Sequence, residues 1–74
     1  MHVELWTSTK GKPRVIAIIR ASGGQMQIEE KEPVPKPVRE DLEGDRKRLS
    51  DDEKFLRYVA TMYQGAYYQA ALKE

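Results

Sequence analysis

Residues 14–20 have the sequence Arg-Val-Ile-Ala-Ile-Ile-Arg, a run dense in β-branched side chains. Such side chains favour extended backbone, and an apolar run without alternation indicates a strand covered on both faces, or covered on one face by a partner. A turn rich in glycine and proline precedes the run at 8–13, and Ser22-Gly23-Gly24 follows it as a second tight turn. The run is therefore predicted to be the central strand of a sheet.

The segments on either side alternate between apolar and polar side chains. Residues 3–7 are Val-Glu-Leu-Trp-Thr and residues 25–29 are Gln-Met-Gln-Ile-Glu. This period of two is typical of strands that bury one face. Because tight turns join the three segments, residues 1–29 are predicted to form a three-stranded antiparallel β-meander.

Residues 30–49 differ in composition and are predicted to be a proline-rich, charged connector. Pro33, Pro35 and Pro37 stand at alternate positions, where they disfavour both a strand ladder and a helix interior. The stretch 37–44 begins with proline and ends with glycine, which permits one or two helical turns. Its charge content predicts a solvated crossover rather than part of the core.

The segment 50–74 is predicted to be one long amphipathic helix. Ser50 and Glu53 have the spacing of a capping box, in which each side chain accepts a backbone N–H of the other residue. Apolar residues from Phe55 to Ala70 recur at helical spacing and would form one stripe against the sheet. Gly65 interrupts this helix at a cost of about 1 kcal/mol and allows either a kink or a close backbone approach. The fold expected for residues 1–74 is a single α+β domain.

The residue inventory argues against catalysis. The chain of 74 residues has no cysteine, and its one histidine is His2, next to the first residue. The serines are expected in turns or caps, with no base nearby in sequence. The carboxylates cluster in the connector and the helix cap, where solvent is expected to leave their pKa values close to those of free carboxylates. We therefore expect a non-enzymatic protein with no catalytic residues, no metal, no cofactor and no small-molecule substrate.

Hydropathy and charge limit the partners further. The longest apolar run has five residues, against the roughly 20 that cross a bilayer, and no secretory signal pattern is present. A cytoplasmic protein without membrane contact is expected. The net charge of +1 creates no strong overall attraction for nucleic acid.

Aromatic side chains exceed what one small sheet and one helix can cover. Tyrosine and tryptophan provide interface area with few rotatable bonds to freeze, so this surplus predicts protein–protein contacts. The simplest form is a homodimer, and a second protein would make the chain an adaptor, inhibitor or regulatory subunit. The candidate contact residues are Trp6, Tyr58, Tyr63, Tyr67 and Tyr68.

Nucleic-acid binding is the alternative. The residues that would contact phosphates surround the first hairpin, and Arg46-Lys47-Arg48 adds a second basic cluster. The expected layout resembles, in arrangement only, domains that read DNA with a three-stranded sheet. The candidate contact residues are Lys10, Lys12, Arg14 and Arg20.

Overall fold

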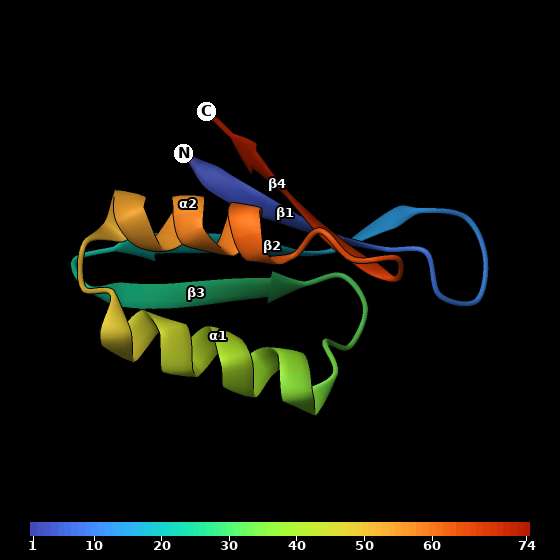
Figure 1. Cartoon of the computed structure of the whole chain (residues 1–74), viewed down its shortest axis with the longest axis horizontal. Helices are drawn as coiled ribbons and strands as arrows, with labels where there is room; N and C mark the ends of the chain where they lie inside the picture. The colour runs from blue at the N-terminus through green and yellow to red at the C-terminus, as the bar shows by residue number, and fades with distance from the viewer.

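The apolar run forms the longest strand of the sheet, in a computed structural model that describes every residue from 1 to 74. Neighbouring strands pair antiparallel in the order β3-β2-β1-β4, so β1 and β2 are the inner strands (Figure 1). The elements in chain order are β1 (His2–Thr7), β2 (Arg14–Ser22), β3 (Gln25–Glu30), α1 (Lys36–Arg48), α2 (Asp52–Met62) and β4 (Tyr68–Lys73).

A β-bulge explains why the apolar run of β2 does not alternate. Leu5 pairs with Ala17 while the next residue, Trp6, pairs with Val15, so Ile16 has no partner in β1. An extra residue of this kind turns two consecutive side chains toward the same face. Ile16 and Ala17 are accordingly both buried. The continuous apolarity therefore reflects a bulge, and it does not require cover on both faces of the strand.

The predicted architecture of a meander followed by one long C-terminal helix is wrong, because the chain has a fourth strand and two short helices. The helix that begins in the predicted region ends at Met62, and the chain reverses before β4. The side-chain amide of Gln64 holds this reversal by donating to the carbonyls of Ala60 and Ala70, at 2.6 and 3.1 Å. Strand β4 pairs with β1 from His2↔Lys73 to Thr7↔Tyr68. This pairing gives hydrogen-bond partners to backbone groups of β1 that would otherwise have none, and it outweighs the apolar stripe that a longer helix would have formed.

The predicted solvated connector is also largely helical. Residues Lys36–Arg48 form α1, in which Val38, Leu42 and Arg46 are buried at a spacing of four. Three buried side chains on one face are sufficient to pack α1 against the sheet, and the many charged residues of α1 occupy its other faces. Proline lies in the first turn, where its missing N–H costs no hydrogen bond.

The cap of α2 lies one residue beyond the predicted capping box. Asp51 is the N-cap, and its carboxylate accepts the backbone N–H of Lys54 at 2.9 Å. Ser50 instead lies in the link between the helices, where its carbonyl accepts a hydrogen bond from Arg46. Any of the three consecutive polar residues can cap a helix, so the sequence alone does not decide which one does.

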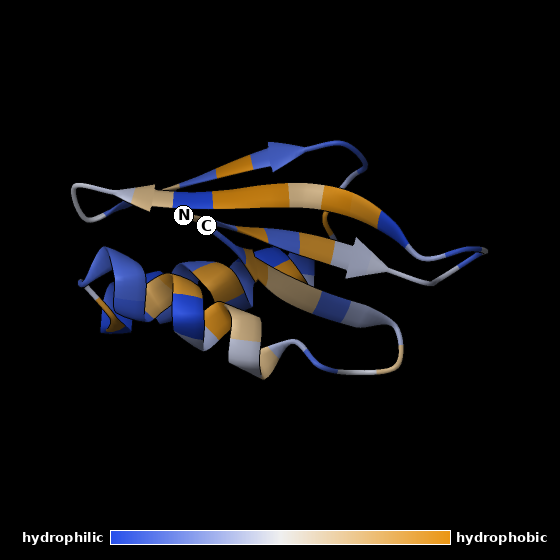
Figure 2. Ribbon diagram, turned by 90° about the horizontal axis from the view of Figure 1, so that it is seen from above, coloured by the Kyte–Doolittle hydropathy of each residue, from blue (hydrophilic) through white to orange (hydrophobic).

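Both helices cover the same face of the sheet, and the opposite face carries no other element (Figures 1 and 2). The core lies between the two layers. Neither helix is long and apolar enough to cross a membrane. The buried apolar residues are Val3, Leu5, Ile16, Ala17, Ile19, Val34, Val38, Leu42, Phe55, Leu56, Val59 and Ala70.

Candidate functional site

The face of the sheet opposite the helices is the candidate interaction surface, and we call it the open face. Side chains alternate along a strand, so the neighbours of buried residues such as Val3, Leu5 and Ile19 point away from the core. Figure 2 shows that no helix covers this side. The open face comprises His2, Glu4, Trp6, Val15, Ile18, Arg20, Gln27, Glu29, Gln69, Ala71 and Lys73.

Apolar side chains follow the middle of the open face. Trp6 lies between Val15 of β2 and Gln69 of β4, and Ile18 and Ala71 lie on either side of Glu4 in the adjacent row. Ala71 and the three larger apolar side chains are all half-buried, although the only cover comes from their neighbours within the sheet. The Trp6 indole N–H donates to a Glu4 carboxylate oxygen at 3.3 Å, so its ring has a defined position.

The charges of the open face form two rows. Glu29 and Glu4 lie in the row of Ile18, which we call the acidic row. Arg20 and Lys73 lie two residues further along their strands, with His2 between them, in the row that we call the basic row. Arg20 pairs with Glu29 at 3.2 Å and Lys73 approaches Glu4 at 3.9 Å, and the face therefore carries both signs.

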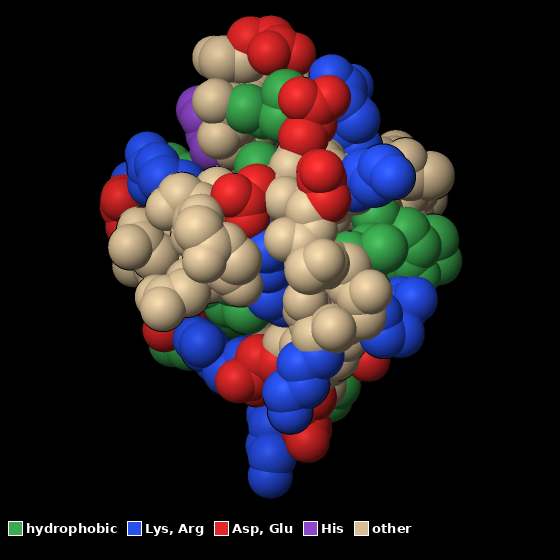
Figure 3. Space-filling view, turned by 90° about the vertical axis from the view of Figure 1, so that its left-hand side faces the viewer, with side chains coloured by type: hydrophobic (Ala, Val, Ile, Leu, Met, Phe, Trp, Pro, Cys, Tyr) green, Lys and Arg blue, Asp and Glu red, His purple; other side chains and the backbone are tan.

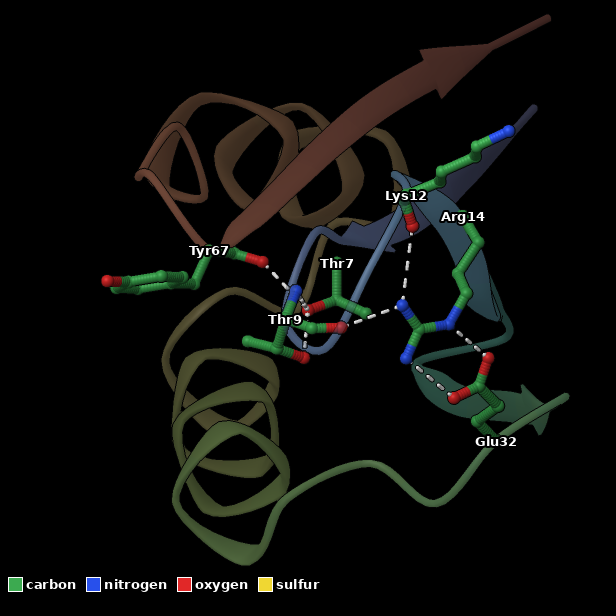
Figure 4. A network of polar contacts seen from close by, with 6 residues as sticks. All are labelled: Thr7, Thr9, Lys12, Arg14, Glu32 and Tyr67. Atoms are coloured by element: carbon green, nitrogen blue, oxygen red, sulfur yellow. Dashed lines mark hydrogen bonds and ion pairs between the residues drawn. The ribbon is translucent and has the colours of Figure 1, made fainter.

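A small pocket lies at one end of this face. Trp6, Pro13 and Tyr67 line it together with Thr7, Ser8 and Gln69, and its volume is about 90 Å³. The backbone carbonyl of Tyr67 accepts hydrogen bonds from the Thr7 hydroxyl at 2.8 Å and from the Ser8 N–H at 3.0 Å. Figure 4 shows the Tyr67 ring pointing away from this network, and the side chain is 66% exposed. The fold thus holds an aromatic ring in solvent on a fixed backbone.

The five aromatic candidates do not form one surface. Trp6 and Tyr67 share the end of the open face. Tyr68 begins β4 and packs at the margin of the core. Tyr58 and Tyr63 face α1 from α2 and its C-cap, on the helical side of the molecule.

Tyr63 has the most unusual environment of the four tyrosines. Its hydroxyl is buried and has no hydrogen-bond partner. Burial, followed by the negative charges of Asp41 and Asp45, raises the pKa of Tyr63 to about 12. The phenol therefore stays neutral near Asp41 and Asp45 over the whole ordinary pH range.

The four basic candidates for nucleic-acid contact are also dispersed. The Arg14 guanidinium makes two hydrogen bonds to the Glu32 carboxylate, at 2.6 and 3.0 Å, and one to the Thr9 carbonyl (Figure 4). The hydrogen bond to Glu32 raises the pKa of Arg14. Arg20 pairs with Glu29, so only Lys10 and Lys12 remain without an acidic partner. At the opposite end of the molecule, near the link between the helices, basic and acidic side chains intermingle (Figure 3).

The sequence does not identify Val15, Ile18 and Ala71 as surface residues. The first two lie in a run that gave no alternation because of the bulge, and Ala71 was assigned to a helix. The alternation of the residues before and after the run was the available signal, since it placed Glu4 and Trp6 together on the face opposite Val3 and Leu5.

No group of three or more histidine, aspartate or glutamate side chains is arranged to hold a metal ion. Comparison of the chain with protein-family models, with curated proteins and with solved structures finds no match.

Proposed function

We propose that this chain is a small non-enzymatic binding module that packs the open face of its sheet against a second copy of itself. The observation that supports this is the uncovered apolar strip formed by Trp6, Val15, Ile18 and Ala71, opposite the face that both helices cover. Ile18 is the central apolar contact, because it lies between Glu4 and Glu29 in the acidic row. Trp6 lies at the end of the strip, with its ring held by Glu4.

The arrangement of charge favours a second copy as the occupant. A two-fold axis lying across the strands, between the acidic row and the basic row, sets each row over the opposite row of the other chain. Arg20 and Lys73 of one copy then approach Glu4 and Glu29 of the other. Such an interface is self-complementary, as a two-fold contact requires.

The size of the open face indicates a small interface and hence a weak dimer. Four strands about 4.8 Å apart and six residues at about 3.3 Å each give a footprint of about 20 by 20 Å, or about 400 Å² per copy. Stable complexes bury about 800 Å² per partner, so this dimer belongs among the small interfaces. We expect a dimer whose population depends on concentration in the micromolar to millimolar range.

The same face is suited to a second protein, which would make the module an adaptor, inhibitor or regulatory subunit in the cytoplasm. Nucleic-acid binding has less support, because Arg14 and Arg20 are paired with glutamates and the open face carries Glu4 and Glu29. A DNA contact would have to displace these ion pairs or rely on Lys10 and Lys12 alone.

The test is sedimentation equilibrium over a concentration range from about 5 µM to about 1 mM, together with Trp6 fluorescence. Trp6 is the only tryptophan and its indole N–H donates to Glu4, so its emission should change as the wild type dimerises and Glu4 approaches the basic row of the other copy. Ile18→Lys places a charge in the apolar strip and should leave the chain monomeric throughout. Thr61→Lys adds the same charge on the exposed side of α2 and should dimerise like the wild type.

A wild type that remains monomeric at the highest concentration would overturn the proposal. Equal dimerisation of the Ile18→Lys and wild-type chains would also overturn it, because the interface would then lie elsewhere. Titration with labelled duplex DNA at two salt concentrations tests the alternative. Binding that weakens with salt and is lost on Lys10→Ala or Lys12→Ala would replace the protein-binding proposal with a nucleic-acid one.

A further inference from the structure

A second surface lies on the helical side of the molecule, in a groove between α1 and α2. Asp41 and Asp45 line it from one helix and Tyr58 and Met62 from the other, in each case at a spacing of four residues, and Tyr63 lines its end. The groove has a volume of about 310 Å³. We call these five residues the acidic groove. It is distinct from the open face, which lies on the other side of the sheet.

One guanidinium already occupies the edge of this groove. The Arg48 Nη2 donates to an Asp45 carboxylate oxygen at 2.7 Å and to the Tyr58 hydroxyl at 3.1 Å. Its guanidinium carbon lies 5.2 Å from the centroid of the Tyr58 ring, within the range of a cation–π contact. The wall of the acidic groove is therefore chemically suited to an arginine side chain.

The remaining groups of the groove have no such partner. Asp41 is exposed and takes part in no ion pair. The Tyr63 hydroxyl is buried without a hydrogen-bond partner. Arg48 compensates the charge of Asp45 at the edge, and no basic residue is among the five that line the groove, so the exposed carboxylate of Asp41 has no cation beside it.

The rim of the groove adds an apolar element. Met62 is 57% exposed, and only Tyr67 among the large apolar side chains is more exposed. Methionine adapts its shape to different contacts and is common on surfaces that bind peptides. A ligand that pairs with the carboxylates and covers Met62 needs a positive charge beside an apolar side chain.

We infer that the acidic groove binds an arginine side chain of a partner protein, with an apolar neighbour of that arginine packed on Met62. The guanidinium pairs with Asp41 and stacks against the tyrosines, as Arg48 does at the edge. Arginine fits better than lysine, because its planar cation stacks on aromatic rings and reaches a carboxylate with two donors. This binding does not depend on the dimer.

The experiment uses the full chain and blocked heptapeptides with one variable residue between two leucines. The central residue is arginine, lysine or citrulline, and citrulline has the shape of arginine without its charge. Binding is followed by amide chemical shifts of the protein. We expect shifts centred on Asp41, Tyr58 and Tyr63, with affinity at least fivefold weaker for citrulline and about twofold weaker for lysine.

A matched pair of variants tests the charge. Asp41→Asn should weaken binding of the arginine peptide at least threefold. Glu43→Gln removes the same charge from an exposed position outside the groove, and it should change the affinity by less than about 1.5-fold. Equal effects of the two variants would overturn the inference and indicate general electrostatic attraction. Equal affinity for citrulline, or no binding at millimolar peptide, would do the same.

The Ile18→Lys chain separates this inference from the proposed function. It should bind the arginine peptide as the wild type does, because Ile18 lies on the open face. Peptide binding that disappears in Ile18→Lys, with shifts centred on the open face, would place the peptide there and refute a site in the acidic groove.

Discussion

Replacement of Arg46 by alanine should remove most of the stability of this fold. The side chain is 8% exposed and connects three segments, which are α1, the turn between β2 and β3, and the start of α2 with its preceding link. Its Nε donates to the carbonyl of Gly24 at 3.0 Å, and its Nη2 donates to the Ser50 carbonyl and the Asp52 carboxylate, both at 2.8 Å. The guanidinium also lies 4.9 Å from the centroid of the buried Phe55 ring.

The size of the loss follows from these contacts. A hydrogen bond from a charged group contributes about 1.5–3 kcal/mol when its acceptor stays buried, and less when water can replace the donor. Gly24 is exposed and the Asp52 side chain is 36% exposed, so the three bonds together amount to about 2–3 kcal/mol. Loss of the stem packing on Phe55 adds about 1 kcal/mol. A domain of this size has only about 3–5 kcal/mol in total.

Urea denaturation measures this loss directly. With a slope of about 1 kcal/mol per molar urea, Arg46→Ala should lower the midpoint by about 3 M and leave the chain partly unfolded without denaturant. Arg46→Met keeps the stem and removes Nη1, which is buried without a partner, so it should lose less. Arg48→Ala, two residues along the same helix, removes an exposed side chain and serves as the control. If Arg46→Ala shifts the midpoint no more than Arg48→Ala does, Arg46 does not connect the three segments energetically.

Three further predictions concern acid, base and the turns. The hydrogen bond from Arg14 holds the pKa of Glu32 below its ordinary value of 4.5. The pair therefore stabilises the fold above pH 4.5, and this contribution disappears as the pH falls below the pKa of Glu32 in the folded chain. The urea midpoint of Glu32→Gln should depend less on pH than that of the wild type. Ultraviolet titration should show one phenol that ionises last, with a pKa of about 12, and Tyr63→Phe should abolish that step. The stability of the wild type should decline as the pH rises from 10.0, the ordinary pKa of tyrosine, toward 12, because only the folded chain retains the proton in this range. Gly24→Ala should lower the melting temperature, because Gly24 has a φ of +81°, whereas Gly65→Ala should leave it almost unchanged, since the added Cβ would lie 3.7 Å from its nearest neighbour.

The strands of the first hairpins could be located from sequence because their signal is local. Alternation in residues 3–7 and 25–29 and the glycine turn between β2 and β3 are properties of a few neighbouring residues. The bulge at Ile16 could not be located in this way, because it is defined by the partner strand. It nevertheless decides which of Val15 and Ile16 is buried, and therefore the composition of the open face.

The errors at β4 and α1 have a different cause. The β4 segment Tyr-Gln-Ala-Ala-Leu-Lys consists mostly of residues that favour a helix, and pairing with the free edge of β1 overrides this preference. In α1 the third member of the buried stripe is Arg46, which an analysis of hydropathy counts as surface. Its burial depends on acceptors from Gly24 and Ser50 that only the folded chain assembles.

These corrections change where a binding surface can lie. An isolated three-stranded sheet with one helix would leave apolar surface on several sides, and none of these sides would be preferred for binding. In the observed fold β4 closes the edge of β1, and α1 covers the part of the sheet that α2 does not reach. The uncovered apolar residues of the sheet are thereby confined to the open face, and the candidate aromatic residues of α2 face the acidic groove.

The two surfaces lie on opposite sides of the molecule, one on the sheet layer and the other on the helical layer, so occupation of one leaves the other accessible. The module has a shortest dimension of 20 Å, and no residue belongs to both the open face and the acidic groove. A dimer formed through the open faces would therefore present two acidic grooves on its outer sides. Two linked arginine segments should then bind the wild type more tightly than the Ile18→Lys chain, while single segments bind both equally. Equal affinities for the linked ligand would refute this geometry of the dimer.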